Sequence, residues 1–152
     1  MTERTDQAVP ATADAAVAPP RARPNHRLRA GAVVASIVAA ALVWVIAVPL
    51  FGADIQVQDN QDPPKVIELG LGPIVFMSAV FALLGWGVLA VLERFTRHAR
   101  LIWTVLATVL LLVSFLPLAG EMSAATRVTL GLAHLVIGVI LIPAFYRSTP
   151  RV

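Results

Sequence analysis

The segment Arg127–Tyr146, RVTLGLAHLVIGVILIPAFY, decides how the whole sequence is interpreted. Its interior is apolar except for Thr129 and one imidazole, His134. At about 1.5 Å per residue, a helix of this length crosses a hydrocarbon layer of about 30 Å. The segment is therefore predicted to span a membrane. An ionisable residue inside a membrane span is rare, so His134 becomes the first candidate for a functional role.

Three further apolar segments of similar length occur at residues 30–51, 69–92 and 101–118. With 58% hydrophobic residues, 14% charged residues and a mean hydropathy of +0.80, the composition lies outside that of soluble domains. We expect an all-α fold, a four-helix transmembrane bundle within residues 30–147. A disordered Ala/Pro/Arg-rich tail (1–29) precedes it and a short C-terminal tail (148–152) follows. In the polar loop 52–68, the alternation in DIQVQ could form a short strand, but the DNQDPP cluster that follows is typical of turns, so we assign the loop no regular structure.

The basic residues predict the orientation of the spans. If both termini lie inside, ten of the twelve Lys and Arg residues are on the inner side, and only Lys65 and Arg127 are outside. Basic residues concentrate in the cytoplasmic segments of membrane proteins, so both termini are predicted to be cytoplasmic. Arginine outnumbers lysine and Ala, Val, Gly and Pro are frequent, a bias typical of GC-rich bacteria. We expect a multi-pass protein of the bacterial cell membrane, with the positive charge serving orientation rather than nucleic-acid binding.

Three stretches, FALLGWGVLAVLERF, RLIWTVLATVLLLVSFLPL and VTLGLAHLVIGVILIP, carry a family resemblance. Over residues 30–147 the chain resembles a group of small four-span membrane proteins of actinobacteria that is catalogued as a domain of unknown function. The resemblance implies no activity. It implies that four features recur in the group. The second span ends in LER, the third span has a Trp near its start and a Ser-x-x-Pro near its end, and the fourth span contains a His. Here these fall on Leu92–Arg94, Trp103, Ser114–Pro117 and His134. We expect Trp103 to be an interfacial anchor.

A polar pocket in the outer half of the membrane is one hypothesis for His134. Arg127, Gly131, His134 and Gly138 recur at helical spacing and form one stripe that should face the bundle. A carboxylate beside an imidazole stabilises the imidazolium, which suits proton exchange. The candidate pocket, which would take a proton, a small solute or a lipid headgroup, consists of Glu68, Glu121, Arg127 and His134.

The simpler hypothesis, which we favour, is that neutral His134 forms a hydrogen bond across to a neighbouring helix, to Ser114 or to a backbone carbonyl. Small residues on the spans let neighbouring helices approach closely, and polar side chains there form hydrogen bonds between helices. The candidate helix contacts are Ser78, Ala82, Gly85, Ser114, Gly131 and Gly138.

No catalytic motif is recognisable in the sequence. The absence of cysteine excludes disulfides, thiolate catalysis and thiol-ligated metals. We find no catalytic triad order, histidine cluster or glycine-rich phosphate loop, so we expect no enzymatic activity, no cofactor and no metal. The preferred function is a non-enzymatic accessory or partner-binding subunit embedded in the lipid bilayer, in a homo-oligomer or a larger membrane complex. The alternative is a small proton-linked, solute-handling or lipid-headgroup-handling protein that uses the pocket around His134.

Overall fold

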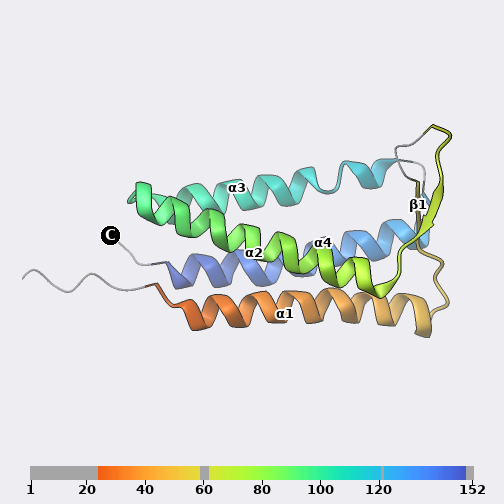
Figure 1. The fold of residues 1–152 in the computed structure, drawn as a ribbon, viewed down its shortest axis with the longest axis horizontal. Coiled ribbons are helices and arrows are strands. Elements are labelled where there is room, and N and C mark those ends of the chain that lie inside the picture. The colour runs from red at the N-terminus through yellow and green to blue at the C-terminus, as the bar shows by residue number, and fades with distance from the viewer. Residues whose placement is uncertain (1–23, 59–61, 121, 150–152) are drawn as a thin grey trace, which may run out of the picture.

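A computed structural model describes residues 24–58, 62–120 and 122–149, which form a four-helix transmembrane bundle (Figure 1). The four predicted spans are confirmed as helices, each long and apolar enough to cross a membrane: His26–Leu50, Leu71–Phe95, Ala99–Ala119 and Ala124–Ser148. The first and last described residues lie at the same end, where the Asn25 amide donates to the Ser148 carbonyl at 3.1 Å. We call this the inner end, and the opposite end the outer end. The tail predicted for residues 1–23 lies outside the described residues.

Helix α1 (His26–Val45) begins earlier than the sequence indicated. Asn25 caps it, because its side-chain oxygen accepts a hydrogen bond from the Leu28 amide at 3.0 Å. Residues 26–29, which we predicted to be the end of a disordered tail, therefore form the first turn of the helix. This correction matters for function, because it places Arg29 inside the bundle.

The outer end of α1 is a π-helical turn, η1 (Ile46–Leu50), which contains Pro49. Proline has no N–H and its ring clashes with the carbonyl four residues earlier, so the α-helical ladder is interrupted there. Gly52 then ends the helix with a φ of +65°, a left-handed conformation that favours glycine. Its amide donates to the Val48 carbonyl at 2.9 Å.

The outer loop contains a short antiparallel hairpin, β1 (Gln56–Gln58) paired with β2 (Val66–Glu68). Strand β1 lies within DIQVQ, where the sequence left a short strand open, and its pairing with β2 is the part that we did not predict. The hairpin is fastened to the bundle by Thr126, which is fully buried. The Thr126 hydroxyl accepts from the Gln56 amide at 3.2 Å and donates to the Asp54 carbonyl at 3.3 Å. These contacts between distant segments fix the loop, and local sequence does not reveal them.

Helices α2 (Leu71–Phe95), α3 (Ala99–Val113) and α4 (Ala124–Ser148) complete the bundle, with a 3₁₀ turn, η2 (Pro117–Ala119), after α3. Helix α1 packs on α4 and α2, and α3 packs on the same two helices from the other side (Figure 1). The largest buried cluster lies in the inner half of the bundle and consists of Ala32, Val33, Ala82, Leu89, Trp103, Leu141 and Phe145.

Helices α3 and α4 approach closely at Gly138. A β-carbon at this position would lie 2.6 Å from Leu111 Cδ2, which is closer than van der Waals contact allows. A β-carbon added at Gly131 would lie 3.6 Å from Leu118 Cδ1 and 3.7 Å from Phe115 Cε1, which are ordinary contact distances. A side chain at Gly138 would therefore force Leu111 to move, whereas one at Gly131 meets only ordinary contacts.

The other positions that we predicted at helix contacts lie in three kinds of surroundings. Ser78 and Ala82 of α2 are buried. The backbone of Gly85 lies against the Trp103 ring. Ser114 instead donates to the Leu111 carbonyl of its own helix segment at 2.6 Å.

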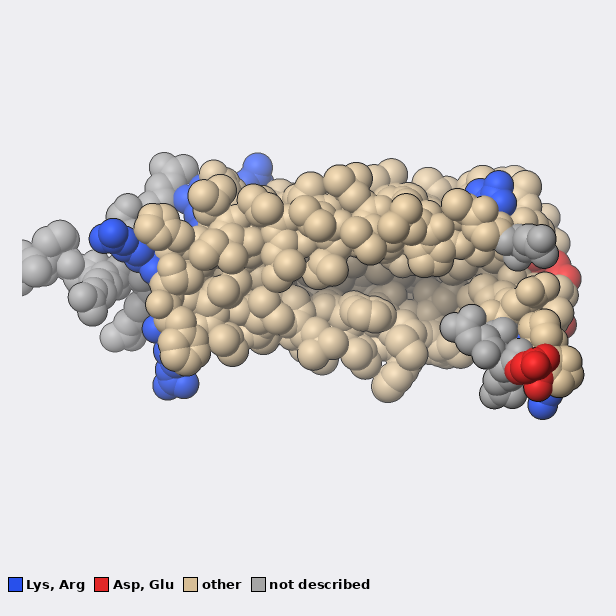
Figure 2. Space-filling view, turned by 90° about the horizontal axis from the view of Figure 1, so that it is seen from above, with Lys and Arg blue, Asp and Glu red and all other residues tan. Residues whose placement is uncertain are grey.

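Charged residues gather at the two ends of the bundle, with an apolar surface between them (Figure 2). The described inner end contains six arginines and a single acid, Glu93; the arginines are Arg27, Arg29, Arg94, Arg97, Arg100 and Arg147. The described outer end carries mostly acids, namely Asp54, Asp62 and Glu68 with Lys65 and Arg127. This asymmetry matches the pattern from which the orientation was predicted.

Replacing Gly138 with leucine should destabilise the bundle by about 1–3 kcal/mol, because the new side chain must displace Leu111 in a packed contact. Gly87→Leu is the matched control, since a β-carbon at Gly87 meets nothing within 4 Å. Thermal unfolding in detergent measures both. A Gly138→Leu protein that unfolds at the wild-type temperature would contradict the close α3–α4 contact.

Candidate functional site at the inner end of the bundle

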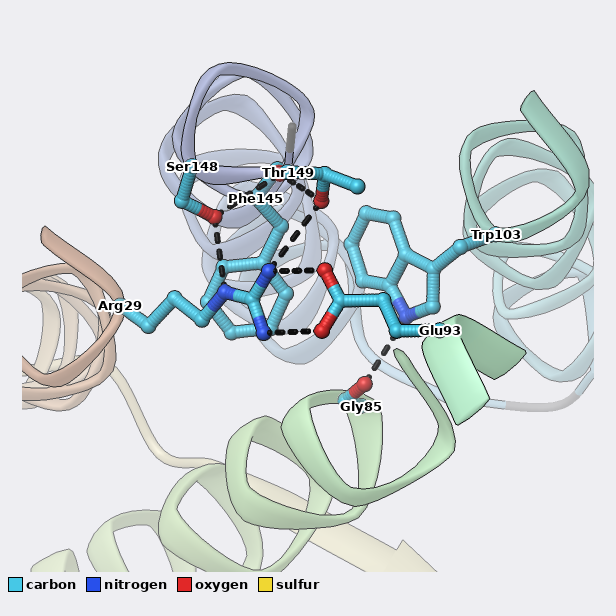
Figure 3. Close-up of polar contacts among 7 residues, drawn as sticks. All are labelled: Arg29, Gly85, Glu93, Trp103, Phe145, Ser148 and Thr149. Atoms are coloured by element: carbon cyan, nitrogen blue, oxygen red, sulfur yellow. Dashed lines mark hydrogen bonds and ion pairs between the residues drawn. The ribbon is translucent and has the colours of Figure 1, made fainter. Parts of the chain in front are cut away.

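The inner end contains a buried arginine, Arg29, on the first turn of α1 (Figure 3). Its side chain has 0% exposure, although it carries a full positive charge. A guanidinium removed from water needs an acceptor for its charge and for its N–H groups. The surroundings of Arg29 supply both.

Glu93, near the end of α2, pairs with Arg29 in a bidentate arrangement (Figure 3). Arg29 Nη1 donates to Glu93 Oε2 at 2.9 Å, and Nη2 donates to Oε1. Two parallel hydrogen bonds between a planar guanidinium and a carboxylate are stronger and more directional than a single contact. The Glu93 side chain is only 16% exposed, so solvent screens the pair weakly.

Two hydroxyl groups from the end of α4 complete the site. Arg29 Nε donates to Ser148 Oγ at 2.8 Å, and Nη2 donates to Thr149 Oγ1 at 3.2 Å. Both hydroxyls in turn donate to the Phe145 carbonyl, at 2.9 Å and 2.8 Å. Helix α4 thus presents hydroxyl oxygens to Arg29 while its own last turn stays hydrogen-bonded.

An aromatic layer lies beside the ion pair, on the side of the core (Figure 3). The Trp103 and Phe145 rings are 5.0 Å apart between centroids, at an interplanar angle of 45°. Trp103 Nε1 donates to the Gly85 carbonyl at 2.8 Å, which links α3 to α2. Trp103 is buried, so our expectation that it is an interfacial anchor was wrong. Its ring fills the core, and its N–H finds a protein acceptor there.

We call the group of Arg29, Glu93, Ser148 and Thr149 the inner polar cluster. It joins α1, α2 and the end of α4, and the two charges within it neutralise each other. The guanidinium has acceptors in three directions, so the cluster binds its own helices and leaves little room for a ligand on Arg29. The cluster holds the ends of α1, α2 and α4 together at the inner end of the bundle.

The residues of the predicted outer pocket are not joined in this way. His134 is half-buried, and its Nδ1 lies 2.7 Å from the Leu130 carbonyl of its own helix. Arg127 is exposed and donates to the Gly120 carbonyl at 3.1 Å, and Glu68 lies on exposed β2. Among the described residues, no hydrogen bond or ion pair links these three. Glu121 lies outside the described residues, so the four-residue pocket stays a prediction.

Our simpler hypothesis placed the hydrogen bond of His134 across the bundle, whereas the carbonyl that its Nδ1 contacts belongs to Leu130 of its own helix. The ring also lies 6.4 Å from the Phe115 ring, measured between centroids, so it faces the α3 side. A separate hollow of about 660 Å³ opens at the outer end. It is lined by the loop after η1, β1, Val66 and the segment that begins α4, and not by His134, Arg127 or Glu68.

The inner polar cluster is the part of the site that sequence reasoning missed. The sequence did contain a hint of this cluster. In the described part of the inner end, Glu93 is the only acidic residue and six residues are arginines. A single carboxylate in a strongly basic segment often has a specific cationic partner. The sequence does not say which arginine that partner is, since Arg29 lies 64 residues away along the chain.

Comparison with known proteins identifies the family. The profile described as "Family of unknown function (DUF6069)" matches residues 20–151, which is most of the chain. The chain belongs to this family. The match includes all four helices and every residue of the inner polar cluster. It confirms the predicted membership in a family of unknown function. No curated protein and no solved structure matches the chain.

Glu93→Gln should destabilise the protein by about 3 kcal/mol or more, because it leaves the buried Arg29 charge without a counter-charge. Arg94→Gln, at the exposed neighbouring position, should change stability by less than about 0.5 kcal/mol. Replacing both partners, as Arg29→Met with Glu93→Leu, should recover most of the loss. Thermal unfolding in detergent tests all three proteins. A Glu93→Gln protein as stable as wild type would contradict the ion pair.

His134→Gln should leave the stability within about 1 kcal/mol of wild type, because the ring nitrogen bonds a carbonyl of its own helix. His98→Gln, at an exposed inner position, is the control. The same proteins in liposomes should show equal pH-dependent proton flux. A folded His134→Gln protein that loses a flux present in wild type and His98→Gln would revive the pocket hypothesis.

Proposed function

We propose that this protein is a non-enzymatic subunit of the bacterial cell membrane that binds a transmembrane helix of another protein through the outward face of α1. The observation that carries the proposal is a second row of small residues on α1. The first row is buried within the bundle and consists of Ala32, Ser36 and Ala40. The second row, one position earlier in each turn, consists of Gly31, Ala35 and Ala39.

The second row is open to the surroundings over most of its length. Gly31 and Ala35 are exposed, and Ala39 is partly buried. A β-carbon added at Gly31 would meet no atom within 4 Å, so no part of the described chain covers this point. Val34 and Val38, on the same side, are 60% and 50% exposed. The small residues of the second row and these two valines together form one apolar face of α1.

Such a face suits a helix better than it suits lipid chains. In a membrane the hydrophobic effect does not drive helices together, so association depends on close backbone approach and van der Waals packing. Small residues at a spacing of four allow that approach, as the buried first row of the same helix illustrates. The expected occupant is an apolar helix that carries small residues of its own.

The polar groups of the bundle support an accessory role more than a catalytic one. Hydrogen bonds of these groups join parts of the fold to one another: Arg29 bonds Glu93 between α1 and α2, and Thr126 bonds the outer loop to α4. Their positions make the bundle a rigid support for the α1 face. The basic inner end supports an orientation with both termini in the cytoplasm (Figure 2).

Site-specific crosslinking in native membranes tests the proposal. Because the chain contains no cysteine, an introduced cysteine is the only position on it that a maleimide labels. Ala35→Cys labelled with a photoreactive maleimide should yield one discrete adduct with another membrane protein. Gly31→Cys should capture the same protein. The control, Leu110→Cys on the exposed surface of α3, should not. Adding Val38→Trp to the Ala35→Cys chain should abolish the adduct, because the ring prevents close approach of a helix.

Two outcomes would contradict this function. One is capture of the same proteins from Leu110→Cys as from Ala35→Cys, which would mean that the label reports collisions only. The other is an adduct that contains two copies of this chain and nothing else, identified by mass spectrometry. That result would replace the separate partner with a homo-oligomer.

A further inference from the structure

A second arginine of the inner end, Arg100, lies in surroundings unlike those of Arg29. It is the second residue of α3, and its guanidinium carbon lies 3.5 Å from the centroid of the Tyr146 ring on α4. This cation–π contact bridges α3 and α4 on the lipid-facing side of the bundle. Stacking on the ring fixes the plane of the guanidinium, and the Nη1 and Nη2 groups at the end of the side chain keep donors for an acceptor.

The N–H donors of Arg100 have no acceptor in the described chain. Its Nε is buried without a hydrogen-bond partner, whereas Arg29 donates to a carboxylate and two hydroxyls. A buried N–H without a partner loses its hydration and gains nothing in return. The chain itself encloses Nε, so an acceptor from outside the chain would meet Nη1 and Nη2, the donors on the partly exposed part of the side chain.

The charges at the inner end indicate what kind of acceptor fits. The only acid of the described inner end, Glu93, is already engaged by Arg29. Arg97, three residues before Arg100, and Arg147, next to Tyr146 on α4, are exposed and add further positive charge at the inner end. An anion with several oxygen acceptors is the complementary ligand. A phosphate group matches the fork of guanidinium donors, and Arg binds it in bidentate fashion.

The position of Arg100 identifies the source of the phosphate. It lies at the inner start of a membrane-spanning helix, at the level of the lipid headgroups. Leu101 and Val105, which follow on α3, are 63% and 55% exposed and offer apolar surface for acyl chains. We infer that Arg100, held on the Tyr146 ring, binds the phosphate of an anionic phospholipid in the inner leaflet.

Lipid retention measured by native mass spectrometry tests the inference on the full chain. Protein purified in a mild detergent is incubated with phosphatidylglycerol, with zwitterionic phosphatidylcholine, or with inorganic phosphate. Wild type should retain phosphatidylglycerol in preference to phosphatidylcholine. Arg100→Gln should reduce the apparent affinity by about tenfold or more, the size expected for losing a hydrogen bond to a charged group. Arg97→Gln removes the same charge from an exposed position of the same segment and should retain the lipid.

Arg100→Lys provides a second variant that keeps the charge if Arg100→Gln fails to fold. Lysine lacks the planar fork that stacks on a ring and binds phosphate with two donors, so retention should fall although the charge is unchanged. Equal retention by wild type, Arg97→Gln and Arg100→Lys would overturn the inference. So would displacement of the lipid by inorganic phosphate at equal concentration, which would mean a free-anion site, or equal retention of both lipids by wild type.

Discussion

The bidentate ion pair between Arg29 and Glu93 is the interaction on which the rest of the bundle depends. A charged guanidinium with 0% exposure at the edge of a membrane strongly destabilises the fold unless it has a counter-charge and acceptors for its N–H groups. Satisfying it requires the end of α2 and the last turn of α4 to meet the first turn of α1. One side chain therefore fixes the relative positions of three helices at the inner end.

The remaining contacts extend this arrangement outward through the membrane. Trp103 packs on Phe145 and donates to the Gly85 carbonyl, which brings α3 against the same inner core. Gly138 then lets α3 and α4 stay close in the middle of the membrane. At the outer end the Thr126 hydroxyl fastens the hairpin to α4. Hydrogen bonds and an ion pair thus keep the helices together at the two ends of the bundle, and close packing at Gly138 keeps α3 and α4 together in the middle.

The sequence could predict the four spans and that the chain enters the first span and leaves the fourth at the same end of the bundle, because both depend on local hydropathy and on counts of basic residues. It could not predict the partner of Arg29, since that depends on which helices are neighbours. His134 attracted attention because an imidazole is rare in a span, yet a carbonyl of its own helix lies within reach. Trp103 was assigned to the interface for a similar reason: its position along the helix is visible in the sequence and its burial is not.

The central claim is that Arg29 and Glu93 are bonded to each other in the membrane. Solid-state NMR on uniformly ¹³C,¹⁵N-labelled protein in lipid bilayers measures this contact directly. The account predicts a cross-peak between an arginine Nη nitrogen and a glutamate Cδ carbon. That peak should be absent from the Glu93→Asp protein and retained in Arg94→Gln. A wild-type spectrum without this cross-peak, recorded on folded protein, would contradict the account.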